Sequence, residues 1–187
     1  MEEKKLSGKN ILMIIASRNF RDEEYFIPFE IFQKAGAKIT TASSVKGEVV
    51  GIEGGEARST LTLEKVAVRN FNAVVFIGGE GTKEYFENET AHKIVQDTVN
   101  ANKILAAICI APVILAKAGV LKGKTATVWS SIANKSGKEE LEKAGCTVSE
   151  QRIERNEKII TADGPAVAGE FAETVIKALT EKANEEI

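Results

Sequence analysis

The sequence contains few of the residues that build disulfide frameworks and metal centres. It has two cysteines and one histidine among its 187 residues. The cysteines, Cys109 and Cys146, are too few for a disulfide framework, and no cysteine or histidine cluster has the spacing of a metal site. We therefore predict that the protein carries no metal and no cofactor.

Excess basic charge and long apolar runs are also missing. The formal net charge is -2, so the basic surface typical of nucleic-acid-binding proteins is not expected. The opening segment, MEEKK, lacks the apolar region of a secretory signal, and the longest apolar runs are far too short to cross a membrane. We expect a cytoplasmic protein that binds neither nucleic acid nor membrane.

What the chain does contain is an alternation of short apolar runs and helical patterns. The continuous apolar runs, typical of parallel strands buried on both faces, are 10–16, 73–77 and 104–108. The helical patterns are 23–34, 90–100, 112–119, 137–144 and 165–179. This alternation predicts an α/β fold with a doubly wound, mostly parallel sheet and helices on both faces. No repeat, linker or low-complexity segment divides the chain, so we predict one domain over 1–187.

The remaining segments are shorter and more polar. We expect a polar loop at 17–22, a strand at 38–42, and loops or an edge hairpin at 43–62, where glycines are frequent. A short strand is predicted at 125–128 and a hairpin around Asn156.

The candidate for chemistry is Cys109, which separates the apolar run 104–108 from a helical pattern. Pro112 is allowed in the first turn of that helix, and Gly119 is placed to end it. No polar linker lies between strand and helix, so the chain must turn sharply at the cysteine, as in a nucleophile elbow. A helix start also favours the thiolate. The alternative is a buried, inert cysteine that acts as a small hydrophobic residue.

Two further strand ends supply partners for such a cysteine. Gly78 and Gly79 follow the run 73–77, and adjacent amides at this turn could form half of an oxyanion hole, with the Ile110 amide as the other half. Glu24 follows the first apolar run, where a carboxyl could orient the thiol or share its proton. The alternatives are a simple turn for the glycines and a favourable helix-dipole partner for the glutamate.

Trp129 and Ser130 follow the predicted strand 125–128 and are candidate pocket-lining residues, together with Gly78. The indole could stack on a substrate or serve in packing. The serine could hydrogen-bond near the pocket or cap the following helix.

These residues, taken in chain order, resemble the ThiJ/PfpI family. The matching segments are 24–30, 34–40, 75–79, 106–112 and 163–165, and the resemblance covers essentially the whole chain. It implies a flavodoxin-like α/β/α sandwich of the class I glutamine amidotransferase-like group, commonly a homodimer or higher homo-oligomer. It also implies that Cys109 is the elbow nucleophile, that Glu24 hydrogen-bonds its sulfur, and that Gly79 and Ile110 supply oxyanion-hole amides.

The chain departs from that family at two positions where its members carry a histidine. Members similar to the PfpI proteases carry a histidine directly after the cysteine, where this chain has Ile110. Other members place one in the loop after the next strand, where Trp129 stands. The single histidine, His92, lies in a predicted helix well before the elbow and is interpreted as a solvent-facing or half-buried residue. No Cys–His pair is visible, so a peptidase is not the favoured function.

Two functions follow from these residues. The first is a cysteine-dependent enzyme acting on a small carbonyl or amide, similar to a glyoxalase, a deglycase or an amidase, with Cys109 as nucleophile and Glu24 as proton carrier. The alternative is a redox-sensing or stress-protection protein, in which Cys109 is oxidised and turns over no substrate.

Overall fold

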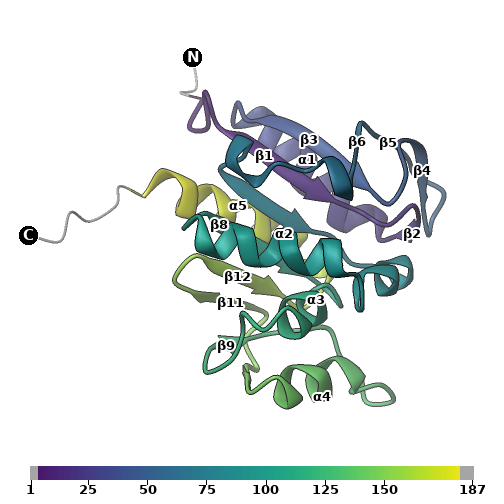
Figure 1. The fold of residues 1–187 in the computed structure, drawn as a ribbon, viewed down its shortest axis with the longest axis vertical. Coiled ribbons are helices and arrows are strands. Elements are labelled where there is room, and N and C mark those ends of the chain that lie inside the picture. The colour runs from purple at the N-terminus through teal and green to yellow at the C-terminus, as the bar shows by residue number, and fades with distance from the viewer. Residues whose placement is uncertain (1–3, 182–187) are drawn as a thin grey trace, which may run out of the picture.

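A seven-stranded sheet forms the centre of the computed structural model, which describes residues 4–181 (Figure 1). Its strands are β1 (Asn10–Ile14), β3 (Lys38–Ser43), β6 (Leu61–Thr62), β7 (Ala73–Phe76), β8 (Ile104–Ile108), β11 (Ile153–Asn156) and β12 (Ile159–Ala162). Their order across the sheet is β11-β12-β8-β7-β1-β3-β6. β11 pairs antiparallel with β12, and the other five pairings are parallel. The predicted doubly wound, mostly parallel sheet is confirmed.

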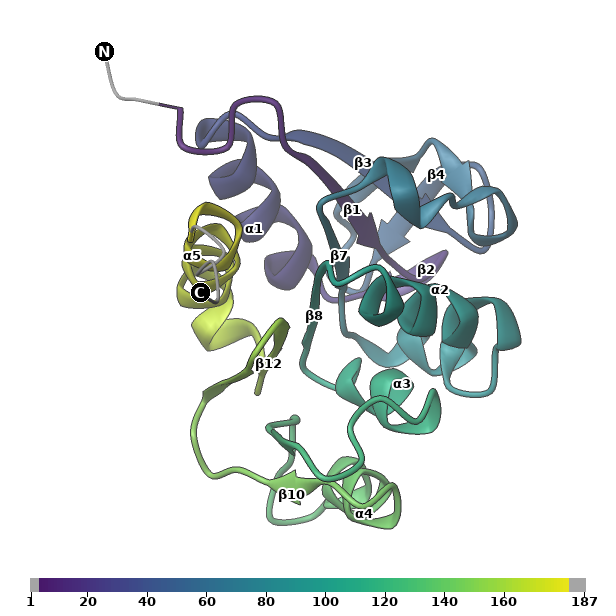
Figure 2. The same ribbon diagram turned by 60° about the vertical axis from the view of Figure 1, so that its left-hand side comes forward.

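Within residues 4–181, five α-helices accompany the sheet. They are α1 (Asp22–Lys34), α2 (Glu89–Asn100), α3 (Pro112–Lys117), α4 (Ser136–Lys143) and α5 (Ala168–Thr180). Figure 2 shows α1 and α5 together on one face of the sheet and α2 and α3 on the other. Of the helices within residues 4–181, none combines the length and apolar character that a membrane span requires.

Alternation along the strands explains the two layers of core. On β1, Ile11 and Met13 join the core beneath α1 and α5, whereas Leu12 and Ile14 join the core beneath α2 and α3. Successive side chains of a strand point to opposite faces, so a continuous apolar run can cover both. The predicted sandwich of helices on both faces is therefore confirmed.

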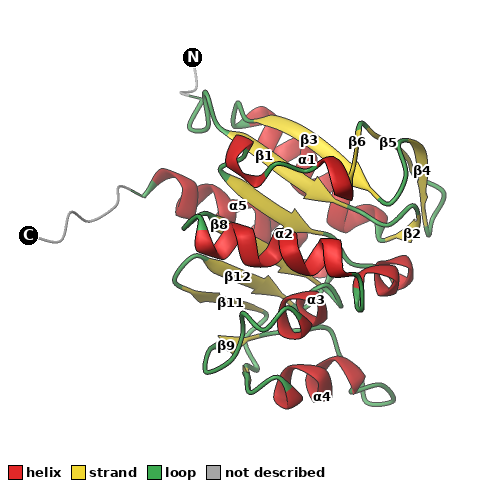
Figure 3. Cartoon of the chain, viewed as in Figure 1, coloured by secondary structure: helices red, strands yellow, loops and turns green. Residues whose placement is uncertain are grey.

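Two smaller sheets flank the main one (Figure 3). The first contains β2 (Arg18–Phe20), β4 (Gly47–Gly51) and β5 (Glu56–Ser59), and the second contains β9 (Thr125–Ala126) and β10 (Thr147–Val148). β4 and β5 form the expected edge hairpin, and β11 and β12 form the hairpin expected around Asn156. The prediction of a polar loop at 17–22 was wrong, because β2 pairs with β4 and buries Phe20 completely.

The carboxyl ends of β1, β7 and β8 converge because these strands are adjacent and parallel. Short 3-10 helices complete the chain: η1 (Leu63–Lys65), η2 (Val68–Asn70), η3 (Glu80–Tyr85) and η4 (Pro165–Val167). η3 begins directly after the turn that follows β7, and three residues separate the end of β8 from the start of α3. Sequence segments far apart therefore meet at one edge of the sheet, where ligands bind in folds of this kind.

Candidate active site

Cys109 lies at a strained turn between β8 and α3. Its φ is +64°, a left-handed conformation that is uncommon for a residue other than glycine. Two backbone hydrogen bonds hold the turn: the Cys109 N–H donates to the Ala162 carbonyl at 2.9 Å, and the Trp129 N–H donates to the Cys109 carbonyl at 2.8 Å. The sharp turn that the sequence predicts is present. Contacts from neighbouring segments, β12 and the loop after β9, hold its strained backbone in place.

Glu24 reaches this turn from the first turn of α1. The residue is 0 % exposed, and its Oε2 accepts a hydrogen bond from the Gly78 N–H at 3.0 Å. The carboxyl lies beside the Cys109 side chain, and each of the two groups shifts the pKa of the other. The other carboxyl oxygen, Oε1, is buried and has no hydrogen-bond partner in the part of the chain that the structure describes. An acid in this setting can hold a proton or release one to a neighbour.

Burial determines the protonation of this pair. Burial raises the pKa of Glu24 to about 7, although hydrogen bonds from Cys109 and Gly78 act in the opposite direction. Burial also raises the pKa of the Cys109 thiol, and the Glu24 charge raises it further. The expectation that the helix start favours the thiolate is therefore corrected: desolvation outweighs the nearby amides. With a pKa of about 7, the Glu24 carboxyl is present in both its protonated and its ionised form near neutral pH.

Gly78 and Gly79 provide the close approach that this arrangement needs. A Cβ on Gly78 would lie 2.5 Å from the Cβ of Cys109 and 2.6 Å from Oε2 of Glu24, so no side chain fits there. Gly79 has φ +104°, which favours glycine. The amides of Gly79 and Ile110 interact with the Cys109 sulfur, and both lower the pKa of the thiol. The two amides expected to form an oxyanion hole are thus directed at the candidate nucleophile.

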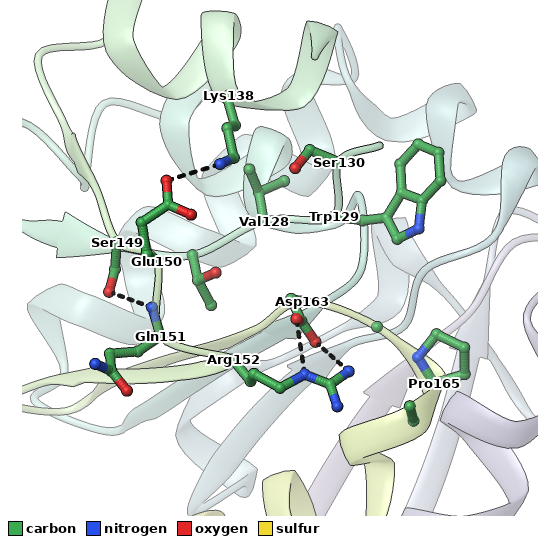
Figure 4. Close-up of a pocket in the computed structure, with 13 residues that line it drawn as sticks. Val128, Trp129, Ser130, Lys138, Ser149, Glu150, Gln151, Arg152, Asp163 and Pro165 are labelled. Carbon is green, nitrogen blue, oxygen red and sulfur yellow. Dashed lines mark hydrogen bonds and ion pairs between the residues drawn. The ribbon is translucent and has the colours of Figure 1, made fainter. Parts of the chain in front are cut away.

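Trp129 and Ser130 lie beside the elbow, each half-buried. Both line a cavity of about 340 Å³ whose other walls come from α4 and the β11–β12 hairpin (Figure 4). Trp129 also borders a second cavity of about 430 Å³, which Ile110 lines as well. Trp129 therefore borders two cavities at the edge of the candidate site.

His92 and Cys146 lie outside the candidate active site. His92 is half-buried on α2, and its Nε2 is 2.7 Å from the Phe86 carbonyl oxygen. Cys146 packs in the core beneath α2 and α3, whereas Cys109 packs in the core beneath α1 and α5. Within residues 4–181, no three histidine, cysteine or acidic side chains gather as a metal site would require.

Sequence reasoning missed the charged residues that line the cavity of about 340 Å³. Arg152 forms a two-pronged ion pair with Asp163, and Lys138 pairs with Glu150 in the same cavity. The available signal was the hairpin itself: Arg152 precedes β11 and Asp163 follows β12, so an antiparallel pairing places the two side by side.

Comparison with known proteins identifies the family of the chain. The family model described as DJ-1/PfpI matches residues 9–178. The chain belongs to the DJ-1/PfpI family. This family is part of the class I glutamine amidotransferase-like superfamily.

Individual relatives of this DJ-1/PfpI protein cover from about two thirds of the chain to nearly all of it. An uncharacterized protein of Methanocaldococcus jannaschii, MJ0967, is 41% identical over 186 residues, which are 98% of this chain and 89% of that protein. The deglycase PfpI of Pyrococcus furiosus is 31% identical over 121 residues, covering 65% of this chain and 73% of the relative. A ThiJ/PfpI domain protein from Brachyspira murdochii has a crystal structure that matches with a TM-score of 0.88 at 29% identity, covering 94% of this chain and all of that one. The predicted flavodoxin-like fold is confirmed.

Removing the Glu24 charge is expected to make Cys109 more reactive toward alkylating reagents. The carboxylate raises the pKa of the thiol, so Glu24→Gln should increase the rate of alkylation by iodoacetamide at pH 7.5 by about tenfold, which corresponds to a pKa lowered by about one. Mass spectrometry of the Cys109 peptide measures the rate, with the Cys146 peptide as an internal control. An equal or slower rate in the variant would show that Glu24 does not act electrostatically on the thiol.

Proposed function

We propose that this DJ-1/PfpI protein is a cysteine-dependent enzyme that converts small 2-oxoaldehydes to 2-hydroxyacids. The observation that carries the proposal is the buried Glu24 carboxyl, with a pKa of about 7, beside the thiol of Cys109. A carboxyl poised near neutral pH can take and return protons within one catalytic cycle. The proposal draws further support from relatives that are named deglycases.

The first step forms a covalent bond between enzyme and substrate. The sulfur of Cys109 attacks the aldehyde carbon while its proton passes to the Glu24 carboxylate, which breaks the S–H bond and forms a C–S bond. The aldehyde oxygen then carries the developing charge, and the amides of Gly79 and Ile110 stabilise it. Glu24 returns the proton to this oxygen, which leaves a hemithioacetal and restores the carboxylate.

The second step moves a proton between the two carbonyl-derived carbons. The Glu24 carboxylate removes the C–H proton of the former aldehyde carbon, and the hydroxyl proton of that carbon passes to the neighbouring carbonyl oxygen. Glu24 then delivers its proton to the neighbouring carbon of this enediol intermediate, which gives the thioester of a 2-hydroxyacid. Water then cleaves the C–S bond, and the products are the 2-hydroxyacid and the free thiol. The sum is addition of one water to the 2-oxoaldehyde, so neither an oxidant nor a reductant is needed. Glu24 is the acid–base group in every one of these steps. This fits a candidate site without a histidine, because His92 lies on α2, outside that site.

Conversion of methylglyoxal to lactate is the expected activity of the purified protein without added cofactor. Lactate formation followed by proton NMR measures it, with heat-denatured protein as the control for spontaneous reaction. The absence of lactate above that control would contradict the proposal. If mild peroxide then oxidised Cys109 selectively and left Cys146 intact, the redox-sensing alternative would become the better assignment, since the Gly79 and Ile110 amides could hold an oxidised sulfur as well.

The assembly and the wider substrate range remain predictions. Amides are the second class of substrate that the elbow could accept, and an amide assay with the same preparations tests that possibility. The homodimer or larger homo-oligomer expected from the family resemblance is tested by the mass in solution.

A further inference from the structure

Polar groups make up the larger part of the walls of the cavity beside Trp129. About 340 Å³ in volume, it lies between the loop after β9, the start of α4 and the two ends of the β11–β12 hairpin. Figure 4 shows side chains from all of these segments around one opening. The lining includes hydroxyl, amide, ammonium, guanidinium and carboxylate groups, which belong to Thr127, Ser130, Ser149, Gln151, Lys138, Arg152, Glu150 and Asp163.

The charged groups of this cavity are arranged in pairs. Arg152 donates from Nε and Nη2 to the two carboxylate oxygens of Asp163 at 3.0 and 3.2 Å. Lys138 Nζ donates to Oε1 of Glu150 at 3.0 Å. Each positive side chain thus has its own negative partner, and the four charged side chains sum to zero. A ligand with net charge would have to compete with one member of each pair, so the cavity favours a neutral ligand.

The ion pairs also orient those polar atoms that are left to contact a ligand. The two-pronged geometry fixes the plane of the Arg152 guanidinium, and it leaves Nη1 without a hydrogen bond to any residue in 4–181. The backbone strengthens the same contact, because the Asp163 N–H donates to the Arg152 carbonyl at 2.9 Å. Donors and acceptors therefore stand side by side in fixed positions, and a hydroxyl group can use both at once.

The apolar part of the wall comes from Val128, Trp129, Pro165 and Ala166. The indole stands at the edge of the cavity, and Gly164 approaches it so closely that a Cβ there would lie 3.4 Å from the ring. A flat aromatic surface next to polar groups suits a molecule whose hydroxyls lie along one edge and whose C–H groups form a face.

The cavity also adjoins the candidate nucleophile. Trp129, which borders the cavity, donates its backbone N–H to the Cys109 carbonyl at 2.8 Å. Trp129 is shared with the cavity that Ile110 lines, so a chain of several carbons that extends along the indole would run from that cavity into this one. A three-carbon substrate such as methylglyoxal has no such chain and gains nothing from it.

We propose that this cavity binds the polyhydroxylated chain of a neutral, sugar-like ligand. Its placement as the substrate's second subsite rests on the proposed function, whereas binding of the chain does not. If both hold, the preferred substrates are 2-oxoaldehydes derived from sugars, which carry the reactive carbonyls at one end and several hydroxyls at the other.

Fluorescence can test the binding without any turnover, because Trp129 is the single tryptophan of the chain. The Cys109→Ser protein is titrated with 3-deoxyglucosone, a 2-oxoaldehyde with a trihydroxylated chain, and separately with methylglyoxal. We expect half-saturation at a concentration at least about tenfold lower for 3-deoxyglucosone, the effect of about two net hydrogen bonds. Equal half-saturation for the two compounds would overturn the proposal.

Substitutions of residues that line the cavity test whether 3-deoxyglucosone binds there. Gln151→Ala and, separately, Arg152→Ala should each weaken binding of 3-deoxyglucosone by about five- to tenfold, and should weaken binding of methylglyoxal by less than twofold. The matched control is Arg155→Ala, which removes a similar two-pronged ion pair, with Glu181, from the same hairpin but outside this cavity. Unchanged binding in both cavity variants, or equal weakening in the control, would overturn the assignment of the site.

Turnover separates this proposal from the proposed function. In active protein, the ratio of kcat/KM for 3-deoxyglucosone to that for methylglyoxal should fall about five- to tenfold in Gln151→Ala. If neither compound is converted while the fluorescence preference holds, the proposed function fails and the binding site stands. If both are converted with equal efficiency and no fluorescence preference is seen, the function stands and the binding site fails.

Discussion

Cys109→Ser is expected to lower the turnover of methylglyoxal by roughly 1,000-fold or more, the loss typical when a nucleophile is removed from an enzyme. The hydroxyl is a far weaker acid than the thiol, and Glu24, with a pKa of about 7, is too weak a base to activate it. The side chains differ by one atom, so the strained turn at φ +64° should persist. The kcat from initial rates, with lactate as product, measures the effect.

Cys146→Ser is the matched control for this prediction. Cys146 is also buried, but it packs on the opposite face of the sheet, and its Sγ donates weakly to the Thr147 carbonyl at 3.5 Å. Turnover within about twofold of the wild type is expected for this variant, since the cost of burying the hydroxyl falls on stability. Full activity in Cys109→Ser, or equal losses in both variants, would remove the elbow from the mechanism.

Glu24→Gln is expected to reduce the turnover of methylglyoxal by about 100- to 10,000-fold, the usual contribution of a positioned acid–base group. Glutamine can still accept the hydrogen bond from the Gly78 N–H, so the turn keeps its support. The amide cannot take up a proton, so both proton transfers lose their carrier. The same variant should alkylate faster, which separates the loss of proton transfer from any loss of thiol reactivity.

The pH dependence of turnover tests the same role of Glu24. The mechanism starts from the Glu24 carboxylate, and the pKa of Glu24 is about 7. Turnover of the wild type should therefore rise with pH through 7 and then level off, whereas the residual turnover of Glu24→Gln should lack that step. Glu30→Gln is the control, because Glu30 also lies on α1 but pairs with Lys34 at the surface. A wild-type profile without a step near pH 7, or a Glu24→Gln rate within threefold of the wild type, would contradict the role of Glu24 as proton carrier.

The elements that sequence reasoning predicted are those with local signals. β8 is a continuous apolar run, Pro112 stands in the first turn of α3, and the absence of a linker between them requires a sharp turn at Cys109. Each of these signals lies within a few residues and depends on no distant partner. The hairpin at β11–β12 was predictable for the same reason.

The elements that were missed depend on distant partners. β2 contains two exposed residues, Arg18 and Asn19, and resembles a polar loop until it pairs with β4, about thirty residues later. Likewise, Arg152 and Asp163 become an ion pair in the cavity wall only because Ile153 pairs with Ala162. Such contacts have no signature in the local sequence.

By itself, the sequence determined the strand and helix order, the sharp turn at Cys109 and the approximate positions of its partners. Only the tertiary structure decided how those groups are charged. A helix start predicted a stabilised thiolate, but the fold buries the thiol and Glu24 together, and the cost of removing charge from water raises the pKa of both groups. Burial depends on every segment that packs around a group, so it is a property of the folded chain. Residue type and spacing alone do not contain it.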